Sequence, residues 1–388
     1  MSLSRRAFFR SAGVAGVGLA AGDFITARGR EAFAATLSQP PARKTTSKLI
    51  SIQANENAYG PGPAALDAIR ALVGPASGRY PMNQPELQSA IAKHFGVEAK
   101  NVLVGTGSTE VIKAAVHAFT GSNRALVAAM PTWEDPGRTA RSLKAPVKDI
   151  AVDNDLRIDI AATTAAAKGA GLVFFCNPNN PTGTVHGKAA VTKFVEEVAA
   201  ASPQTTILLD EAYYDFVVDP GYATGIPLAM KYPHVIVTRT FSKVHGMAGL
   251  RVGYAIGHPD TLKKIEARMT SDMNLLSMAA AAASIQDAAH IAKQRDTIRK
   301  SLEETMQVFK DAGCRVADSQ ANFPLADVKR PTKEFRDACE KQGVIIGRDF
   351  PPLATWARIS IGTTEEMKTA NEVFRKVLAG GKTTTASR

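Results

Sequence analysis

The sequence predicts an α/β protein in which helices cover a mostly parallel sheet. Between Asn101 and Ile256, short β-branched or aliphatic runs alternate with helical patterns, which is typical of that architecture. Several of these runs end at polar or charged residues, and ligands of such proteins bind beyond the carboxyl ends of the strands. The chain of 388 residues is also long enough for two domains with a sizeable core.

Six runs are predicted as strands, and the sequence after them turns helical. The strands are expected at 101–104, 124–130, 171–176, 205–210, 234–239 and 251–257. From Thr261 to about Lys310 the Ala-rich pattern predicts one long helix that connects to a second domain. That domain should hold the segment 314–328, a helix within 332–343 and the run "ARISIGT" at 357–363.

The composition is that of an ordinary globular protein. Hydrophobic residues make up 45% and charged residues 21% of the chain, and no apolar run reaches the length of a membrane span. The three cysteines have neither metal-ligand spacing nor the pattern of a disulfide framework, so no metal site is expected. The net charge of +11 comes without a basic run, which favours small anionic substrates or a solvated basic surface over nucleic acid.

The N-terminus has the three parts of an export signal in order. "SRRAFFR" at 4–10 is followed by a mildly apolar Gly/Ala-rich segment and by "AFAA" at 32–35, which resembles a twin-arginine signal with its cleavage site. The alternative is an amphipathic N-terminus with a chance Arg-Arg pair. We expect export through the twin-arginine translocase to the periplasm or the medium, and a cytoplasmic protein if this interpretation of the leader is wrong.

The chain therefore divides into a leader, a linker and two domains. We expect a signal peptide at 1–34, a linker at 35–48, an N-terminal segment of the smaller domain at 49–78, a large ligand-binding domain at 79–288, the rest of the smaller domain at 289–380 and a disordered tail at 381–388.

Four of the strand ends carry chemically suggestive residues. In "VLVGTGSTEVI", glycines precede Ser108 and Thr109 at a helix start, where free N–H groups and the helix dipole favour a small phosphate. An ordinary helix N-cap is the alternative for these two residues. In "FFCNPNNPTGTV", prolines hold the amide of Asn180 in a stiff turn. Asp210 ends an apolar strand, and a carboxylate there needs a partner because an unpaired buried charge is costly.

The fourth end, "TRTFSKVHGMAGLRVGY", places Lys243 among small, β-branched and aromatic residues. A lysine in such surroundings has a lowered pKa or is used in a covalent bond, unless its stem lies on a surface loop with the amine in water. A phosphate-binding helix start, a carboxylate, a rigid amide, a phenol and a reactive lysine together describe a pocket for pyridoxal phosphate. In that pocket, Lys243 would hold the cofactor as a Schiff base.

Motifs in family order extend this interpretation over nearly the whole chain after the leader. They are "NENAYGP", "RYP", "GTGSTEVI", "PTWEDP", "NPNNPTGT", "DEAY", "RTFSK", "ANF", "GRDF" and "WARISIGT". The sequence resembles the fold-type I, class I/II pyridoxal-phosphate aminotransferases, and most of all their histidinol-phosphate aminotransferase branch. The resemblance implies a large domain with a mostly parallel seven-stranded sheet and a smaller α+β domain.

The resemblance also implies roles for individual residues. Lys243 is the Schiff-base lysine and the acid and base for the Cα proton, and Asp210 pairs with the pyridine nitrogen. Tyr213 and Asn180 hydrogen-bond the ring's phenolic oxygen, and Trp133 stacks on the ring. The residues expected around the phosphate are Ser108, Thr109, Thr240, Ser242, Arg251 and, from the neighbouring subunit, Tyr80. Tyr80 therefore implies a homodimer with shared active sites.

The substrate side is implied by two arginines. Arg358 matches the residue that binds the α-carboxylate or its equivalent, and Arg348 matches the residue that holds the phosphate of histidinol phosphate, with a surface salt bridge as the alternative. Tyr59 and Asn180 should line the same pocket. The segment "FPPLATW" at 350–356 differs from the pattern of the biosynthetic enzymes. Histidinol phosphate is also a cytoplasmic metabolite, so the leader favours another donor, such as an aromatic or acidic amino acid.

The predicted activity is ping-pong transfer of an amino group from an amino acid or amino phosphate to a 2-oxo acid. The same pocket could support decarboxylation or β-elimination, since spacing does not show which bond at Cα is broken. A non-catalytic cofactor-binding protein is the alternative of another class, and the intact pair of Lys243 and Asp210 argues against it.

Overall fold

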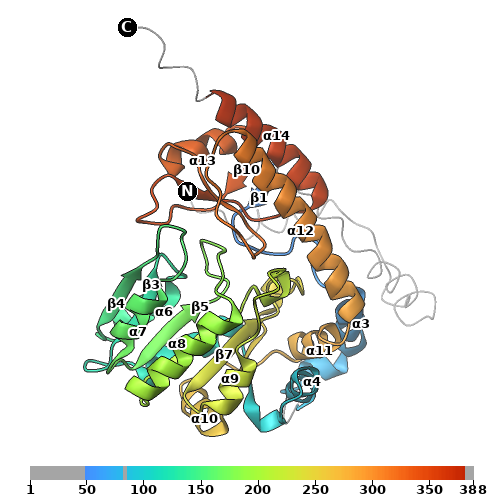
Figure 1. The fold of residues 1–388 in the computed structure, drawn as a ribbon. Coiled ribbons are helices and arrows are strands. Elements are labelled where there is room, and N and C mark those ends of the chain that lie inside the picture. The colour runs from blue at the N-terminus through green and yellow to red at the C-terminus, as the bar shows by residue number, and fades with distance from the viewer. Residues whose placement is uncertain (1–48, 82–84, 381–388) are drawn as a thin grey trace, which may run out of the picture. The chain divides into compact units, whose positions relative to one another are not determined.

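A computed structural model describes residues 49–81 and 85–380, and these form one compact unit (Figure 1). The predicted leader, the linker and the C-terminal tail lie outside the described residues. Within the described part, no helix is both long enough and apolar enough to cross a membrane.

A seven-stranded sheet forms the centre of the unit. Its strand order is β2-β8-β7-β6-β5-β3-β4, and β8 runs antiparallel to both of its neighbours while the other pairs are parallel. The strands are β2 (Val102–Gly105), β3 (Leu126–Met130), β4 (Val147–Ala151), β5 (Leu172–Cys176), β6 (Thr206–Asp210), β7 (Val235–Thr240) and β8 (Gly253–Gly257). The mostly parallel sheet and the six predicted strands are confirmed. The prediction missed β4, because this edge strand is partly exposed and mixes polar with apolar residues.

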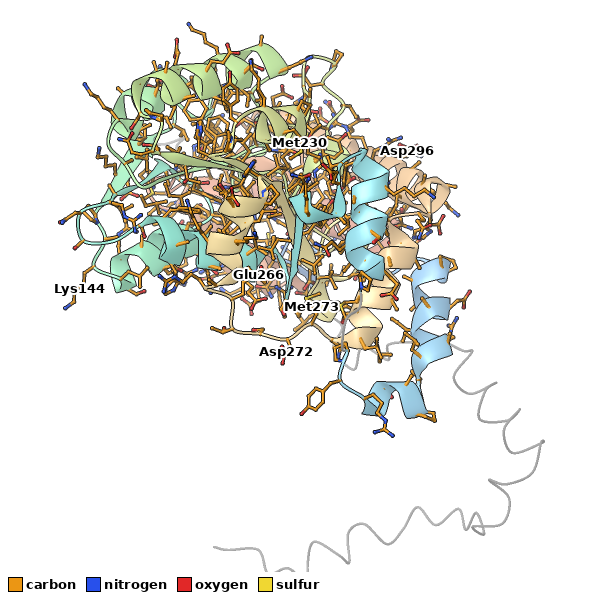
Figure 2. The ribbon with its side chains drawn as sticks, turned by 90° about the horizontal axis from the view of Figure 1, so that it is seen from below. Lys144, Met230, Glu266, Asp272, Met273 and Asp296 are labelled. Atoms are coloured by element: carbon orange, nitrogen blue, oxygen red, sulfur yellow. The ribbon has the colours of Figure 1, made fainter. Side chains whose placement is uncertain are left out.

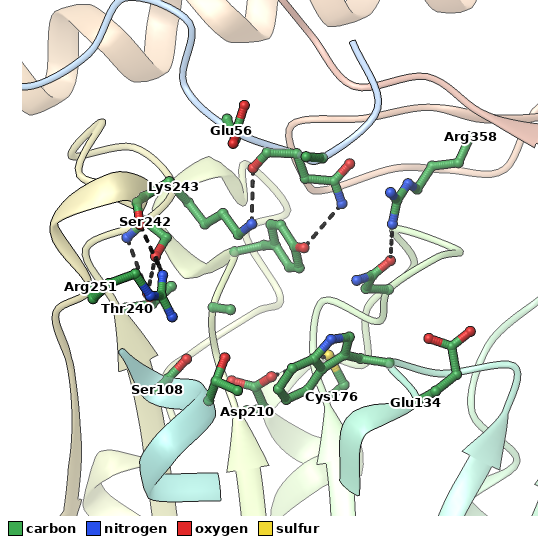
Figure 3. A pocket seen from close by; sticks show the side chains of 18 of the residues that line it. Glu56, Ser108, Glu134, Cys176, Asp210, Thr240, Ser242, Lys243, Arg251 and Arg358 are labelled. Carbon is green, nitrogen blue, oxygen red and sulfur yellow. Dashed lines mark hydrogen bonds between the residues drawn. The ribbon is translucent and has the colours of Figure 1, made fainter. Parts of the chain in front are cut away.

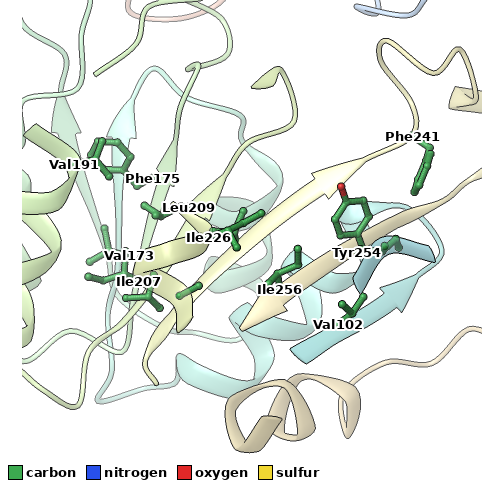
Figure 4. Packing of buried hydrophobic residues seen from close by; sticks show 14 of the residues in the cluster. Val102, Val173, Phe175, Val191, Ile207, Leu209, Ile226, Phe241, Tyr254 and Ile256 are labelled. Atoms are coloured by element: carbon green, nitrogen blue, oxygen red, sulfur yellow. The ribbon is translucent and has the colours of Figure 1, made fainter. Parts of the chain in front are cut away.

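Helices cover both faces of the sheet because alternate residues of each strand point to opposite sides. On one face, Phe175 and Leu209 pack in a cluster that is shown in Figure 4. On the other face, Phe174 and Leu208 pack in a second cluster. The helices that supply the first cluster are α3 (Pro63–Leu72), α4 (Glu86–Phe95), α7 (Ile160–Ala167), α8 (Lys188–Ala201), α9 (Ile226–Lys231) and α11 (Leu275–Ser284). Those that supply the second are α5 (Ser108–Phe119), α6 (Asp135–Ser142) and α10 (Pro259–Glu266).

The predicted long helix from Thr261 to Lys310 is wrong in its continuity. The structure divides the segment into α10, α11 and α12 (Ala288–Asp311). Asn274 and Asp287 start α11 and α12, since each side chain accepts a hydrogen bond from backbone N–H in the first turn. Figure 2 labels Asp272 and Met273 in the chain between α10 and α11, and the neighbouring Ser271 N–H donates to the carboxylate of Glu110 in α5.

The C-terminal part has its own core. Two short pairs of strands lie there, β1 (Ile50–Ile52) parallel to β10 (Val344–Ile346) and β9 (Leu325–Asp327) antiparallel to β11 (Trp356–Arg358). The phenylalanines of α12, α13 (Thr332–Glu340) and α14 (Thr364–Gly380) pack against each other. The helices α13 and α14 are drawn in orange and red in Figure 1. The N-terminal strand β1 thus joins the C-terminal part, whereas α3 (Pro63–Leu72) packs against α11. The predicted domain boundaries stay predictions.

One glycine fixes the distance between the sheet and the start of α5. A Cβ atom at Gly253, the first residue of β8, would lie only 2.0 Å from the backbone nitrogen of Ser108. The backbone of β8 fixes the position of the Cβ atom and the nitrogen belongs to the backbone of α5, so neither can move away without shifting a strand or a helix. The close approach therefore requires glycine at this position.

We predict that Gly253→Ala lowers the free energy of unfolding by about 1–3 kcal/mol, as overpacking does elsewhere. It should also displace the start of α5. Gly121→Ala is the matched control, because a Cβ there meets nothing within 4 Å. Denaturant unfolding of both variants measures the effect. Equal stability of the two variants would contradict the close contact between β8 and α5.

Candidate active site

A pocket of about 500 Å³ lies at the carboxyl edge of the sheet (Figure 3). It brings together twelve of the predicted site residues: Ser108, Thr109, Trp133, Asn180, Asp210, Tyr213, Thr240, Ser242, Lys243, Arg251, Arg348 and Arg358. Tyr59 is not part of this lining, and its hydroxyl is hydrogen-bonded to Thr364 instead. Tyr80 also lies outside, with 85% of its surface exposed. The predicted roles of these two tyrosines stay predictions.

The floor of the pocket is formed by three neighbouring strand ends. In the sheet register, Asp210 of β6 lies between Cys176 of β5 and Thr238 of β7. The Thr238 hydroxyl donates to Asp210 Oδ1 at 3.0 Å, and the Cys176 thiol donates to Oδ2 at 3.8 Å. Burial raises the pKa of Asp210 to about 6. No cationic group of the described residues lies within 4 Å of this carboxylate, so its negative charge is available to a positively charged ligand atom.

Lys243 extends into the pocket from the loop after β7. Its Nζ donates to the backbone oxygen of Asn55 at 3.0 Å and lies 5.4 Å from the ring centre of Tyr213. Asn55 has a φ of 53°, a conformation that asparagine tolerates, and its side-chain amide donates to the Tyr213 hydroxyl. Desolvation, followed by the charge of Arg358, lowers the pKa of Lys243 to about 8. A substantial fraction of the amine is therefore neutral and nucleophilic near physiological pH.

An anion cradle lies at one end of the pocket. The first turn of α5 begins at Ser108 and Thr109, where the amides of a helix lack partners inside the helix. Arg251 Nη1 donates to Ser242 Oγ at 3.4 Å and to the Ala248 oxygen at 2.9 Å. A Cβ at Gly107, whose φ is 79°, would lie 2.3 Å from Arg251 Nη2, so glycine is needed for this approach. Positive charge and helix N–H groups thus face the same space.

Arg358 lies at the other end, in the view of Figure 3. It is 7% exposed, and its two Nη atoms donate to Asn180 Oδ1 at 2.7 Å and to the Gln53 oxygen at 2.8 Å. Its Nε is buried without a hydrogen-bond partner in the described part of the chain. Burial lowers the pKa of Arg358 to about 10. A buried guanidinium with no carboxylate partner is a binding site for a ligand carboxylate or phosphate.

Arg348 has a different environment. Its Nη2 forms an ion pair with Glu134, and its guanidinium lies over the ring of Phe350 at 4.4 Å. Both Arg348 and Glu134 line the pocket. The salt bridge that was the alternative for Arg348 is therefore present, although it lies at the pocket and not on a remote surface.

Sequence reasoning missed several residues of this site. Cys176 and Thr238 bond Asp210 from neighbouring strands, and strand pairing at the ends of β5, β6 and β7 was the signal that could have found them. Asn55 stood inside the quoted motif "NENAYGP" without an assigned role. Glu134 directly follows Trp133, but its partner lies 214 positions away, and no local pattern shows such a contact.

The residues present fit pyridoxal phosphate. Asp210 has no cationic partner among the described residues, so its carboxylate is available to the protonated ring nitrogen of the cofactor. The start of α5 together with Arg251 offers positive charge to the cofactor phosphate. Trp133 supplies an aromatic wall, and Lys243 an amine that can attach covalently. When bound, the cofactor supplies an aldehyde for that attachment and a ring that withdraws electrons from the substrate Cα.

The raised pKa of Asp210 gives a prediction for stability. The native state binds this proton more tightly than the unfolded state does. The stabilisation that protonation provides is complete below about pH 3.8 and is lost as pH rises through about 6. At pH 7.5 the cofactor-free Asp210→Asn variant should therefore melt at a higher temperature than the parent, and the difference should shrink as pH falls below 6.

The same variant should gain less from the cofactor. Addition of pyridoxal phosphate should raise the melting temperature of the parent more than that of Asp210→Asn, because only the carboxylate compensates a protonated ring nitrogen. Calorimetry over pH 4–8 with and without cofactor checks both effects. A cofactor-free variant that is less stable than the parent at pH 7.5 would show that the carboxylate has a compensating partner within the protein.

Comparison with known proteins agrees with this geometry. Residues 47–374 match the family "Aminotransferase class I and II". The histidinol-phosphate aminotransferase of Moorella thermoacetica is 33% identical over 344 residues, which cover 85% of this chain and 86% of that protein. The enzyme of the same name from Bacillus subtilis is 34% identical over 339 residues, with 86% and 91% covered.

A solved structure with bound cofactor is similar to this chain in fold. The histidinol-phosphate aminotransferase of Sinorhizobium meliloti, in complex with pyridoxal-5'-phosphate, superposes with a TM-score of 0.78 at 25% identity, covering 90% of this chain and 94% of that one. The chain therefore belongs to the class I and II aminotransferase family, and it is a pyridoxal-phosphate-dependent transaminase.

Proposed function

We propose that this aminotransferase takes the amino group from a donor that carries an anionic group, an amino acid or an amino phosphate, and passes it to a 2-oxo acid at the same site. The observation that carries the proposal is that the Lys243 amine and the guanidinium of Arg358 face one pocket. Because one pocket serves both substrates in turn, the kinetics are ping-pong.

The residues divide the work. Arg358 binds the anionic group of the donor and so orients the bonds at Cα. Lys243, with a pKa of about 8, accepts a proton and returns it near neutral pH, as a general acid and base. Asp210 holds positive charge at the ring nitrogen. Asn180 accepts from Arg358 through Oδ1, which leaves its NH₂ group free to donate into the pocket.

Amino transfer is favoured over the other reactions of such a pocket. The named relatives are aminotransferases, and their matches cover most of both chains. A decarboxylase or a β-lyase is therefore the weaker alternative. A non-catalytic protein has no use for a lysine whose pKa is lowered beside a buried, uncompensated carboxylate.

A further part of the proposal is a homodimer with shared sites. The supporting observation is that Tyr80 is 85% exposed, and that Val73, seven positions earlier in the chain, is 59% exposed. In the resemblance, the residue at Tyr80 reaches the cofactor phosphate of the neighbouring subunit. A partner subunit would cover this aromatic side chain.

The central test is a half-reaction screen. Purified holoenzyme is mixed with one amino acid or amino phosphate at a time. The experiment follows the loss of the absorption band of the cofactor's imine with the lysine. At least one donor should convert the parent, and Lys243→Ala should slow that conversion roughly 10³-fold or more, because it removes both the attachment and the proton carrier. No conversion by any donor, or equal rates in the variant, would refute the proposal.

We also propose export in the folded, cofactor-loaded state. The leader pattern at 1–34 supports the twin-arginine route, which carries folded proteins. The pocket supports it independently, since its residues come from segments that meet only after folding, and the cofactor is supplied in the cytoplasm. Export to the periplasm or the medium with cleavage near Ala34 follows.

Replacing both Arg5 and Arg6 with lysine should therefore trap an active, full-length enzyme in the cytoplasm. The parent should be found outside the cytoplasm, with its N-terminus near Ala34 or Ala35 and with bound cofactor. Cell fractionation, N-terminal sequencing and cofactor absorbance of each fraction measure this. If the parent stays in the cytoplasm with residues 1–34 attached, the leader is not an export signal.

A further inference from the structure

The arginines of the pocket differ in their charge partners. Four of them line it among the described residues. Arg138 is paired with Asp135 at 2.6 Å, and Arg348 is paired with Glu134. Arg251 and Arg358 have no carboxylate within 4 Å in the described part of the chain. Since Arg251 belongs to the anion cradle at the start of α5, Arg358 is the one arginine of the described pocket lining that is left without a carboxylate partner on the substrate side.

The charge of Arg348 is already paired, although its side chain is 52% exposed. Its Nη2 is bound to Glu134, its Nη1 donates to the Asp349 oxygen at 3.1 Å, and its face lies over Phe350. Glu134 neutralises the charge of this guanidinium, and its carboxylate repels a substrate phosphate or second carboxylate that approaches the same place.

Glu134 is the residue directly before α6, at the wall of the pocket. It lies between Trp133, which lines the pocket, and Asp135, which starts α6. Its side chain is 34% exposed, so it stays solvated. Glu56 lines the pocket as a second exposed carboxylate and has no ion-pair partner among the described residues. The carboxylates of the substrate side thus oppose additional negative charge on a ligand.

We infer that Glu134 is a specificity-determining residue: by occupying Arg348 it restricts the donor to an amino acid with one carboxylate and an uncharged side chain. This inference rests on the proposed aminotransferase function and narrows its donor. A phosphate monoester carries nearly two negative charges at neutral pH and a dicarboxylic amino acid carries a second carboxylate, and each needs a second cation that Glu134 neutralises. Both classes of donor are therefore disfavoured in the parent enzyme.

The test compares three donors in half-reactions of the holoenzyme: phenylalanine, glutamate and histidinol phosphate. The variant Glu134→Gln keeps the shape of the side chain and removes its charge. We expect its kcat/KM to rise roughly tenfold or more for glutamate and histidinol phosphate, the gain from one freed charge-assisted contact. The value for phenylalanine should stay within about threefold.

Two matched variants assign the effect to Arg348. Asp149→Asn removes an equal charge and frees Arg141, and neither residue lines the pocket, so it should leave the order of the three donors unchanged. The double variant Glu134→Gln with Arg348→Gln should lose the gain. Glu134→Ser serves as a second substitution, and thermal melting with cofactor absorbance shows that each variant is folded and loaded.

Binding of inorganic phosphate to the holoenzyme gives a readout that is independent of turnover. As a competitor of phenylalanine, phosphate should bind more tightly to Glu134→Gln than to the parent or to Asp149→Asn. A parent that already prefers histidinol phosphate, or an equal gain in Asp149→Asn, would overturn the inference and leave the aminotransferase function intact. If no donor converts any variant, the proposed function itself is wrong.

Discussion

The site depends on one electrostatic constraint: the charges of Asp210 and Arg358 face the pocket, and neither has a partner of opposite charge among the described residues. Asp210 is buried with hydrogen bonds only from a hydroxyl and a thiol, and Arg358 is buried with bonds only to neutral oxygens. Uncompensated charges of this kind are costly in a folded protein unless a ligand completes them. Pyridoxal phosphate would bring a cation to Asp210 and an anion to the start of α5, and under the proposed function the substrate would bring an anion to Arg358.

The fold places these charges because the sheet is mostly parallel. The carboxyl ends of β5, β6 and β7 lie side by side, so Asp210 receives donors from both neighbouring strands. The chain then turns after β7 to bring Lys243 over the same edge, and the close packing of Gly253 against Ser108 sets the helix start beside it. Arg358 comes from β11 in the C-terminal part. The arginine expected to bind the substrate anion therefore comes from a different part of the fold than Asp210 and Lys243.

Much of this could be predicted from sequence, and the rest depends on contacts that a linear pattern does not contain. Strand ends rich in polar residues, together with the family motifs, predicted Lys243, Asp210 and the seven-stranded sheet. The edge strand β4 was missed because it is partly exposed and mixes polar with apolar residues. The breaks before α11 and α12 were missed because the caps Asn274 and Asp287 start new helices within an Ala-rich helical pattern. The pairing of Glu134 with Arg348 joins residues far apart in the chain, and only the folded structure shows it.

The measurement that tests the account most directly is identification of the lysine that carries the cofactor. The holoenzyme is treated with borohydride, digested and mapped by mass spectrometry. The account predicts one modified peptide, with the pyridoxyl group on Lys243, since this amine combines a pKa of about 8 with a position inside the pocket. Stable attachment to another lysine, or a protein that binds the cofactor with Lys243 unmodified, would contradict it.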